Sequence, residues 1–453
     1  MEKGGETKVN EFFSYPLEER ISKVAEEFLT LPKDKEIQII SHFDTDGITS
    51  AAIIIKCMKR LDIKFNTLIV KNLTSDIISH LPKDKTLLFI DLASNSLNLL
   101  GEFKSKVFVI DHHEITQSLP PNVSIINPQL HEKVDEISSS GLCYLFAKKI
   151  NQKNKDLAAL AIIGMIGDSI KNISISNNEI TKDAEIVIKK GILLYPSTRP
   201  LNKVLEFSSE PYIPSVTGNK EGVFQLLKEI GFERENGQYK SLIELNEEEM
   251  MKIVTAILLR RLEKNNEDLI GNIFLVKHFN QLEDAREISA KINASSRLGE
   301  SHTSILYCLG DAKAKKQVEK LYARYKQMII NGLNFVETIQ QIRGNGYVII
   351  NAKSNIDDSL VSVIATILSK SSLYEEGTVI IIMSDAGDNK IKVSARTVRK
   401  GRNVREVLER TMSDIGGEFG GHKYAAGCLI DNSKEQEFIE RIKKDLEIEL
   451  VKI

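Results

Sequence analysis

Residues Ile39 to Ile55, IISHFDTDGITSAAIII, place charged residues between two apolar runs. His42, Asp44 and Asp46 follow the first run directly. Charged side chains are almost never buried unless they are paired or bind a metal ion. The first apolar run predicts a buried strand, so these three side chains lie where an α/β sheet usually binds its ligands.

The bulk composition sets limits on the class of protein. A chain of 453 residues is long for one core and predicts two or three domains. The 61 Lys and Arg residues balance 63 Asp and Glu residues, so a polyanion site must come from local clustering. The four cysteines form no CxxC pair, which disfavours a zinc knuckle and a disulfide framework. Since no signal peptide or membrane span is present, we expect a soluble, cytoplasmic protein without a membrane partner.

Short β-rich runs alternate with helix-length segments between Ile37 and about Asp168. The runs are EIQII, FNTLIV, TLLFI, KVFVI and VSII, and one of the helical segments is Thr49 to Leu61. This alternation predicts an α/β fold with a parallel sheet covered by helices. An amphipathic helix precedes the runs, and its apolar face comprises Ile21, Val24, Ala25 and Phe28.

Three of these runs pass from buried aliphatic residues straight into aspartate or histidine. Because the carboxyl ends of parallel strands meet at one edge, we expect these side chains to converge on one rim. They are His42, Asp44, Asp46, Asp91, Asp111, His112 and His113. A further apolar helix, Leu157 to Ile166, ends at Gly167 and brings Asp168 toward the same place.

So many carboxylates and imidazoles on one rim would repel one another unless a cation lay among them. Two divalent ions about 3.5–4 Å apart meet this need and catalyse phosphoryl transfer. The mixture of imidazole and carboxylate ligands favours Mn²⁺, with Mg²⁺ or Co²⁺ as alternatives, whereas zinc sites more often use cysteine.

Each motif also has a purely structural interpretation. HFDTDG could form an Asx-turn that caps the following helix, and Asp91 or Asp168 could cap a helix as well. The DHH triplet could satisfy only local hydrogen bonds. Four such motifs in order, each at the end of an apolar run, favour the metal site over these alternatives.

The second half of the chain predicts a further α/β unit. Strands YVIINA and TVIIIMSD flank a helix from Asp358 to Ser369, and a long charged helix, Asp311 to Ile339, precedes them. We therefore predict a first domain at residues 1–310 with a mostly helical insertion at about 185–283. A connector helix at 311–340 and a smaller α/β domain at 341–453 follow.

The motifs together resemble those of the DHH phosphoesterase superfamily. His42-x-Asp44-x-Asp46-Gly47, Asp91, Asp111-His112-His113 and the segment Gly164 to Asp168 are similar to its four signatures. GGHKYAAG (Gly420 to Gly427) and VSART (Val393 to Thr397) are similar to the DHH-associated C-terminal domain. KINASSRLG (Lys291 to Gly299) resembles RecJ-type exonucleases, and the compact chain looks like the archaeal RecJ-like subgroup.

This resemblance implies roles for individual residues. His42 and Asp44 would hold one metal, Asp46, His112 and Asp168 the other, and Asp91 would bridge both. His113 would face the scissile phosphate, and Asp111 would support the histidine pair. The resemblance and the local charge imply substrate contacts from Asn293, Arg297, Ser394, Arg396, Gly420, Gly421 and His422.

We expect a glycine-rich turn that contains Gly416, Gly417, Gly420, Gly421 and Gly427, because these glycines allow positive φ and a close backbone approach to phosphate. Arg396 and His422 add charged donors. Aromatic residues make up only 6% of the chain and there is no Trp, so we expect Phe419 and Tyr424 to pack in a core rather than stack on bases.

The leading hypothesis is a metal-dependent exonuclease that acts at an end of single-stranded DNA or RNA, in DNA replication, DNA repair or RNA turnover. A second hypothesis is a phosphodiesterase or phosphatase that acts on short oligonucleotides, as nanoRNases do, or on nucleoside bisphosphates or cyclic dinucleotides. A third, of another class, is a scaffold that binds GINS and the replicative helicase, because a eukaryotic replication factor shares the fold of the RecJ-like group.

Overall fold

The computed structural model describes residues 16–131, 136–170, 173, 178–208, 211, 213–261, 269–371 and 373–449. These residues form two compact units that divide between Tyr322 and Ala323. The division falls within a long helix, α15 (Ala312–Thr338). This helix confirms the long helix expected from Asp311 to Ile339. Among the described residues, no helix combines the length and the apolar character that a membrane crossing requires.

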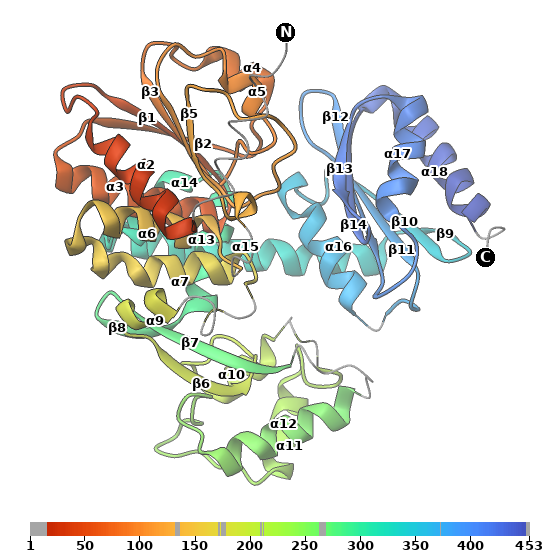
Figure 1. Cartoon of the computed structure of the whole chain (residues 1–453). Helices are drawn as coiled ribbons and strands as arrows, with labels where there is room; N and C mark the ends of the chain where they lie inside the picture. The colour runs from red at the N-terminus through yellow and green to blue at the C-terminus, as the bar shows by residue number, and fades with distance from the viewer. Residues whose placement is uncertain are drawn as a thin grey trace. The chain divides into compact units, whose positions relative to one another are not determined.

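The first unit contains the predicted parallel sheet. Its five strands are β1 (Ile37–His42), β2 (Phe65–Val70), β3 (Thr86–Ile90), β4 (Val107–Ile110) and β5 (Val123–Ile126). They are parallel in the order β2-β1-β3-β4-β5, so the direction of winding reverses between β1 and β3 (Figure 1). Ligands bind at such a switch point, outside the carboxyl ends of the strands.

Helices cover both faces of this sheet, as its continuous apolar strands require. One face carries α2 (Leu17–Leu29), α3 (Thr45–Leu61), α6 (Ser139–Ile150) and α7 (Ala158–Gly167). The other face carries α4 (Ser75–His80) and α5 (Leu97–Leu100). Successive strand residues serve the two cores in turn, so Ile39 packs with α3 whereas Ile40 packs with α5.

Helix α3 begins four residues earlier than the predicted Thr49. Asp44 caps it, because the Asp44 carboxylate accepts a hydrogen bond from the Gly47 N–H at 3.0 Å. A side chain at Gly47 would meet the carbonyl oxygen of His42 at 2.3 Å, so glycine permits this close start. The capping interpretation of HFDTDG is therefore correct for Asp44, and it leaves the other carboxylate oxygen for another partner.

The expected insertion contains the helices α10 (Leu201–Glu206), α11 (Lys220–Glu229) and α12 (Glu247–Arg261), with a core of their own. It also contains an antiparallel sheet that the sequence did not predict, made of β6 (Val187–Ile192), β7 (Ile270–His278) and β8 (Gln281–Asp284). Helix α9 (Asn178–Asp183) precedes this sheet, and α13 (Ala285–Arg297) and α14 (Ser301–Cys308) follow it. Helix α13 packs on α3 and α7, so this segment returns to the first sheet.

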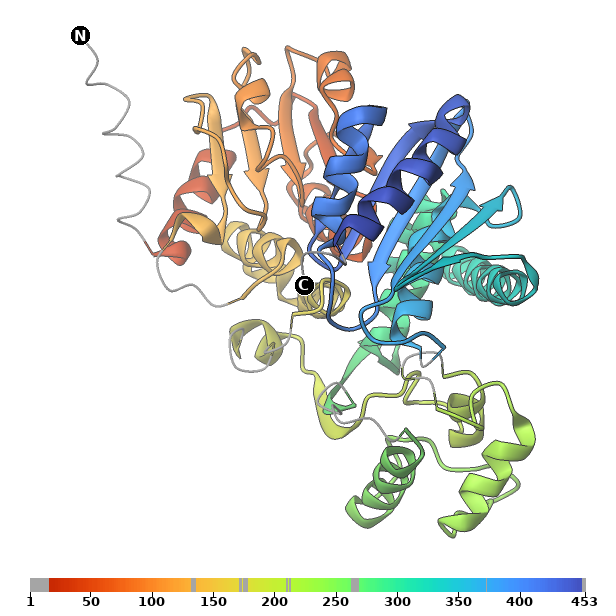
Figure 2. The ribbon, with the colours of Figure 1, turned by 90° about the vertical axis from the view of Figure 1, so that its right-hand side faces the viewer.

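The second unit is a six-stranded sheet in the order β13-β14-β12-β11-β10-β9. The strands are β9 (Ile342–Gly344), β10 (Tyr347–Lys353), β11 (Val379–Asp385), β12 (Lys390–Thr397), β13 (Glu418–His422) and β14 (Ala425–Asp431). Only β10 and β11 pair in parallel, and α16 (Val361–Lys370) connects them as predicted. Helices α17 (Val404–Ile415) and α18 (Glu435–Glu449) lie side by side over one face (Figure 2).

Candidate metal centre

The predicted rim residues lie at the ends of three adjacent strands. His42 is the last residue of β1, Asp91 follows β3, and Asp111 to His113 follow β4. Asp91 has a left-handed backbone (φ 60°), which is unfavourable for a residue other than glycine, and its N–H donates to the Ile110 carbonyl at 2.9 Å. Strain of this kind persists where the surrounding structure holds a functional side chain in place.

A first group consists of His42, Asp44 and Asp91. The Nδ1 atom of His42 lies 3.1 Å from Asp44 Oδ2 and 3.4 Å from Asp91 Oδ2. The Nε2 atom of the same ring lies 3.2 Å from the carbonyl oxygen of Lys71, which can only accept, so Nε2 carries a proton. In the neutral imidazole Nδ1 is therefore an acceptor that faces two other acceptors and has no hydrogen-bond partner.

A buried acceptor among carboxylates requires a cation, and either a proton or a metal ion can supply it. Burial alone would lower the pKa of His42, but the carboxylates of Asp44 and Asp91 outweigh burial and raise this pKa to about 10. The same contact overcomes the burial of Asp44 and lowers its pKa to about 2. The donor set of this group therefore fits a divalent ion that would displace the imidazole proton.

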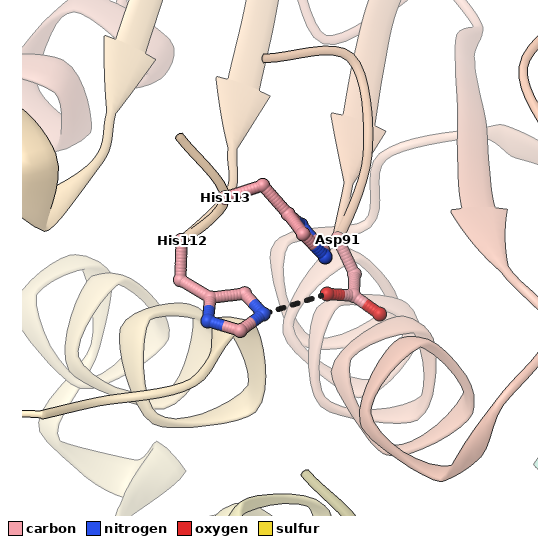
Figure 3. Close-up of side chains that lie close together, drawn as sticks. All are labelled: Asp91, His112 and His113. Atoms are coloured by element: carbon pink, nitrogen blue, oxygen red, sulfur yellow. Dashed lines mark ion pairs between the residues drawn. The ribbon is translucent and has the colours of Figure 1, made fainter. Parts of the chain in front are cut away.

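A second group consists of Asp91, His112 and His113 (Figure 3). The Oδ1 atom of Asp91 lies 3.5 Å from His112 Nε2. In each of the two groups, one potential ligand atom from each side chain lies within 4.8 Å of the others. Asp91, only 2% exposed, is common to both groups and presents Oδ2 to the first and Oδ1 to the second.

Asp168 and Asp46 flank the second group. The Oδ2 atom of Asp168, at the end of α7, lies 3.6 Å from His112 Nδ1. Burial and neighbouring carboxylates raise the pKa of Asp168 to about 6, although His112 opposes this. Burial and the charge of Asp91 raise the pKa of Asp46 to about 8. Negative charge is thus in excess around His112, as expected of a site for a cation.

The carboxylate of Asp46 is held by the first turn of α6. It accepts hydrogen bonds from Ser138 Oγ at 2.6 Å, from the Ser139 N–H at 2.8 Å and from the Ser140 N–H at 3.0 Å. The sequence analysis assigned Asp46 and Asp168 to one ion together with His112. The second group of three instead combines His112 with Asp91 and His113 and contains neither Asp46 nor Asp168. The assignment of Asp46 and Asp168 as ligands stays a prediction.

His113 is oriented by a buried carboxylate. Its Nδ1 lies 2.7 Å from Asp111 Oδ1, and Asp111 also accepts from the backbone N–H groups of Ser94 and His112. Burial would raise the pKa of Asp111, but these hydrogen bonds lower it to about 2. The hydrogen bond to Asp111 raises the pKa of His113, whose side chain is 49% exposed. His113 can therefore present Nε2 as a proton donor.

Two sets of residues at this site were missed from the sequence. Asn127, at the end of β5, donates from Nδ2 to Ser94 Oγ at 3.0 Å and to the His113 carbonyl at 2.9 Å. The serines from Ser138 to Ser140 hold Asp46, as described above. The only signal for these serines was their place before an apolar helical run, which predicts a helix start but no function.

Asn293 and Arg297, predicted to contact substrate, lie near the end of α13. Arg297 Nε donates to Asn293 Oδ1 at 3.1 Å, and the guanidinium carbon lies 5.8 Å from the ring centroid of Phe43. The Phe43 ring in turn meets the His42 ring edge-on, with centroids 5.0 Å apart. The structure therefore brings Arg297 close to Phe43, which lies in the chain between His42 and Asp44.

The other predicted substrate residues lie together in the second unit. Ser394 and Arg396 are on β12, and Gly420, Gly421 and His422 are on β13. Arg396 and His422 both pair with Ala425 of β14, which lies between these strands, so both side chains project from one face. Arg396 donates from Nη1 to Ser394 Oγ at 3.0 Å and from Nε to Thr366 Oγ1 at 3.1 Å.

The structure corrects two expectations about this segment. Gly416, Gly417 and Gly421 have the expected positive φ (76°, 118° and 131°), but Gly420, Gly421 and Gly427 lie in strands β13 and β14 rather than in a turn. A side chain at Gly421 would meet the Ala425 carbonyl oxygen at 2.4 Å, so tight strand pairing requires this glycine. Phe419 and Tyr424 are not packed in a core, because they are 41% and 39% exposed.

Three family models match successive parts of the chain. They are the DHH family N-terminal domain at residues 36–165, the DHH-CID domain at 194–270 and the DHHA1 domain at 344–447. An uncharacterized protein of Methanocaldococcus jannaschii is 26% identical over 425 residues, which cover 90% of this chain and 92% of that protein. The three family models lie between residues 36 and 447, so the similarity extends along most of the sequence.

Solved structures share the fold at low sequence identity. The exonuclease RecJ bound to manganese matches with a TM-score of 0.59 and 19% identity, over 94% of this chain and 93% of that one. CDC45 from Entamoeba histolytica matches with a TM-score of 0.65 and 13% identity, over 94% and 99% of the two chains. The Mn²⁺ complex of RecJ from Thermus thermophilus matches at 0.59 and 19%, over 94% of this chain and 54% of that one. The chain therefore belongs to the DHH phosphoesterase superfamily and has a RecJ-like fold.

Proposed function

We propose that this protein is an exonuclease that uses two divalent metal ions to hydrolyse phosphodiester bonds at an end of single-stranded DNA or RNA. The observation that carries the proposal is the position of Asp91, whose two oxygens face two different histidine-containing groups. A shared carboxylate between two closely spaced cation sites is the arrangement of two-metal phosphoesterases. The position of His42 Nδ1 between oxygens of Asp44 and Asp91 supports the same conclusion.

We assign His42, Asp44 and Asp91 to one ion, and Asp91, His112, Asp168 and Asp46 to the other. Imidazole and carboxylate ligands together favour Mn²⁺, with Mg²⁺ or Co²⁺ as alternatives. Such a pair of ions supplies a nucleophile at neutral pH and neutralises charge on the phosphate.

The chain's own residues supply proton transfer and orientation. His113, held by Asp111 through Nδ1, would donate a hydrogen bond from Nε2 to an oxygen of the scissile phosphate. The hydrogen bond to Asp111 raises the pKa of His113, which favours the protonated form of the ring. Asn127 Nδ2 donates a hydrogen bond to the carbonyl oxygen of His113. This bond fixes the His113 backbone and so helps to orient its imidazole ring.

The face of β12 and β13 would bind the nucleic acid. Arg396 and His422 project from one face and can pair with phosphate, which binds guanidinium and imidazolium groups well. Tyr424, in the turn between β13 and β14, exposes an aromatic ring near them in sequence, whereas Phe419 pairs with Cys428 and projects from the opposite face. Single-stranded nucleic acids stack on exposed rings without regard to base sequence. A single-stranded substrate accounts for this combination better than a duplex does.

The test uses end-labelled DNA and RNA in a length series from dinucleotides to long oligomers, with and without a 5′ phosphate, in Mn²⁺, Mg²⁺ or Co²⁺. We expect stepwise release of nucleotides from long oligomers and loss of activity in Asp91→Asn. Rates that fall steeply beyond a few nucleotides would favour the alternative of short oligonucleotides or cyclic dinucleotides. Wild-type protein that is inert with all three metals would overturn the proposal.

A second candidate function is that of a replication scaffold which binds GINS at the replicative helicase. Its support is the fold that the chain shares with CDC45, although 13% identity conveys the fold alone. All the histidines and carboxylates of the predicted metal site are present here, and a pure scaffold would have no need of them. Capture of GINS by both wild-type protein and Asp91→Asn would support a scaffold role beside catalysis, whereas no capture would exclude it.

A further inference from the structure

We infer that Ser139 is a positioning residue, which orients the carboxylate of Asp91 so that its two oxygens serve two different metal ions. This inference rests on the proposed function, because it concerns the same two-metal site. Ser139 is the first residue of α6, is fully buried and belongs to none of the signature motifs. It does not contact the reacting atoms and acts only through Asp91.

Ser139 contacts both buried carboxylates of the second metal site. Its hydroxyl donates to Asp91 Oδ1 at 2.9 Å, and its backbone N–H donates to Asp46 Oδ2 at 2.8 Å. Asp91 is 2% exposed and Asp46 1%, so bulk water cannot replace either hydrogen bond. One residue therefore fixes the relative positions of two side chains that come from different elements of the fold.

The orientation of Asp91 decides how many ions it can serve. A carboxylate can bind one ion through both oxygens or bridge two ions with one oxygen each. The Ser139 hydroxyl occupies one lone pair of Oδ1, which leaves the other for a ligand near His112, while Oδ2 faces His42. Rotation of the carboxylate toward a single ion would break this buried hydrogen bond, so Ser139 favours the bridging orientation.

The three consecutive serines have three different targets. Ser138 Oγ donates to Asp46 Oδ1 at 2.6 Å, and Ser140 Oγ donates to the Ala161 carbonyl at 3.0 Å. Only the Ser139 hydroxyl reaches Asp91 among these three. Ser140 is not a neutral control, because its hydroxyl also bonds the Ser138 hydroxyl that donates to Asp46. Ser304→Ala serves as the control, since it removes a fully buried hydroxyl whose partners are the backbone carbonyls of Ile292 and Glu300.

The experiment is calorimetric titration of purified, metal-free protein with Mn²⁺, with thermal unfolding of the same samples. Ser139→Ala removes the donor to Asp91 and keeps the N–H that binds Asp46. We expect two ions per wild-type chain, and in Ser139→Ala one ion at nearly wild-type affinity and a second weakened roughly 10- to 100-fold. We expect Ser304→Ala to bind both ions as the wild type does.

Two results would overturn the inference while the proposed function survives. One is Ser139→Ala with both ions at wild-type affinity, and the other is equal weakening of both ions, which indicates a general structural role. Should Ser139→Ala not fold, Ser139→Cys takes its place, because a thiol has nearly the same shape but is a weaker donor, and the same split is expected. Wild-type protein that binds no Mn²⁺ would instead contradict the proposed function itself.

Discussion

The rim at the end of the first sheet and the edge of the second sheet place functional side chains in opposite ways. At the rim, Asp46, Asp91 and Asp111 are almost completely buried. At the edge, Phe419 and the other residues of β13 are largely exposed. Burial strengthens electrostatic interactions with an ion, whereas exposure leaves donors and rings accessible to a long, flexible substrate.

The two regions are also stabilised differently. The rim depends on a strained backbone at Asp91 and on hydrogen bonds from the start of α6 to Asp46. The edge is a regular antiparallel pairing in which Gly421 allows the strands to approach closely. We therefore expect changes at the rim to affect metal binding and kcat, and changes at the edge to affect KM.

The largest effect is expected at the residue that both cation groups share. Asp91→Asn keeps the volume of the side chain but removes its charge, so we expect kcat to fall by at least about 10³-fold and uptake of the second Mn²⁺ to be lost. Steady-state kinetics on end-labelled oligonucleotides and Mn²⁺ titration measure the two effects. Asp91→Asn with at least a tenth of the wild-type kcat would show that the rim is not the catalytic site.

The next effect is a pH dependence of Mn²⁺ affinity, which originates at the rim. In metal-free protein the pKa values of His42 and His112 are raised to about 10, because nearby carboxylates outweigh burial, so both rings are protonated at neutral pH. An ion must displace these protons, and its apparent affinity should rise about tenfold per pH unit for each proton released.

Calorimetry in buffers with different ionisation enthalpies counts those protons directly. Arg396→Ala is the control, because its substitution lies in the other unit and should leave proton release unchanged. An Mn²⁺ affinity that does not change between about pH 6 and pH 8 would contradict the proposed ligand set.

A smaller effect is expected at the edge of the second sheet. Arg396→Ala removes a charged donor, which we expect to raise KM for oligonucleotides roughly 10- to 100-fold while kcat changes little. Kinetics over a range of substrate concentrations separate the two constants. A fall in kcat at unchanged KM would place Arg396 in the chemical step. It would contradict the expectation that changes at the edge affect KM alone.

The smallest effect is expected from an exposed ring. Tyr424→Ala should weaken binding of single-stranded oligonucleotides about fivefold if one base stacks on the ring. Fluorescence anisotropy with labelled oligonucleotides measures this change, and Leu373→Ala is a control because that side chain is also exposed and lies outside the turn between β13 and β14. Equal effects of the two substitutions would remove Tyr424 from the binding surface.

Much of the first unit could be predicted from the sequence because its signals are local. Each of the five strands is an apolar run, and the polar residues that follow β1, β3 and β4 reach the rim through strand geometry alone. The face of α2 was predicted correctly because Ile21, Val24, Ala25 and Phe28 are all buried.

The features that were missed depend on contacts between distant parts of the chain. The Ser139 hydroxyl meets a carboxylate 48 positions earlier, and no local pattern encodes that meeting. The glycines of β13 indicated a turn, but pairing with β14 overrides their local preference. Strand β6 was not predicted either, because its lysines and glycine are not typical of a strand. It forms by pairing with β7, about 80 residues later.

Electron paramagnetic resonance of the Mn²⁺-loaded protein distinguishes two ions bridged by Asp91 from two independent ions. Two Mn²⁺ ions about 3.5–4 Å apart would be coupled through a shared carboxylate. We predict the spectrum of a spin-coupled pair at two ions per chain, and its replacement by that of isolated ions in Asp91→Asn. A wild-type spectrum of isolated Mn²⁺ at every loading, or no bound Mn²⁺ at all, would show that Asp91 does not bridge two ions.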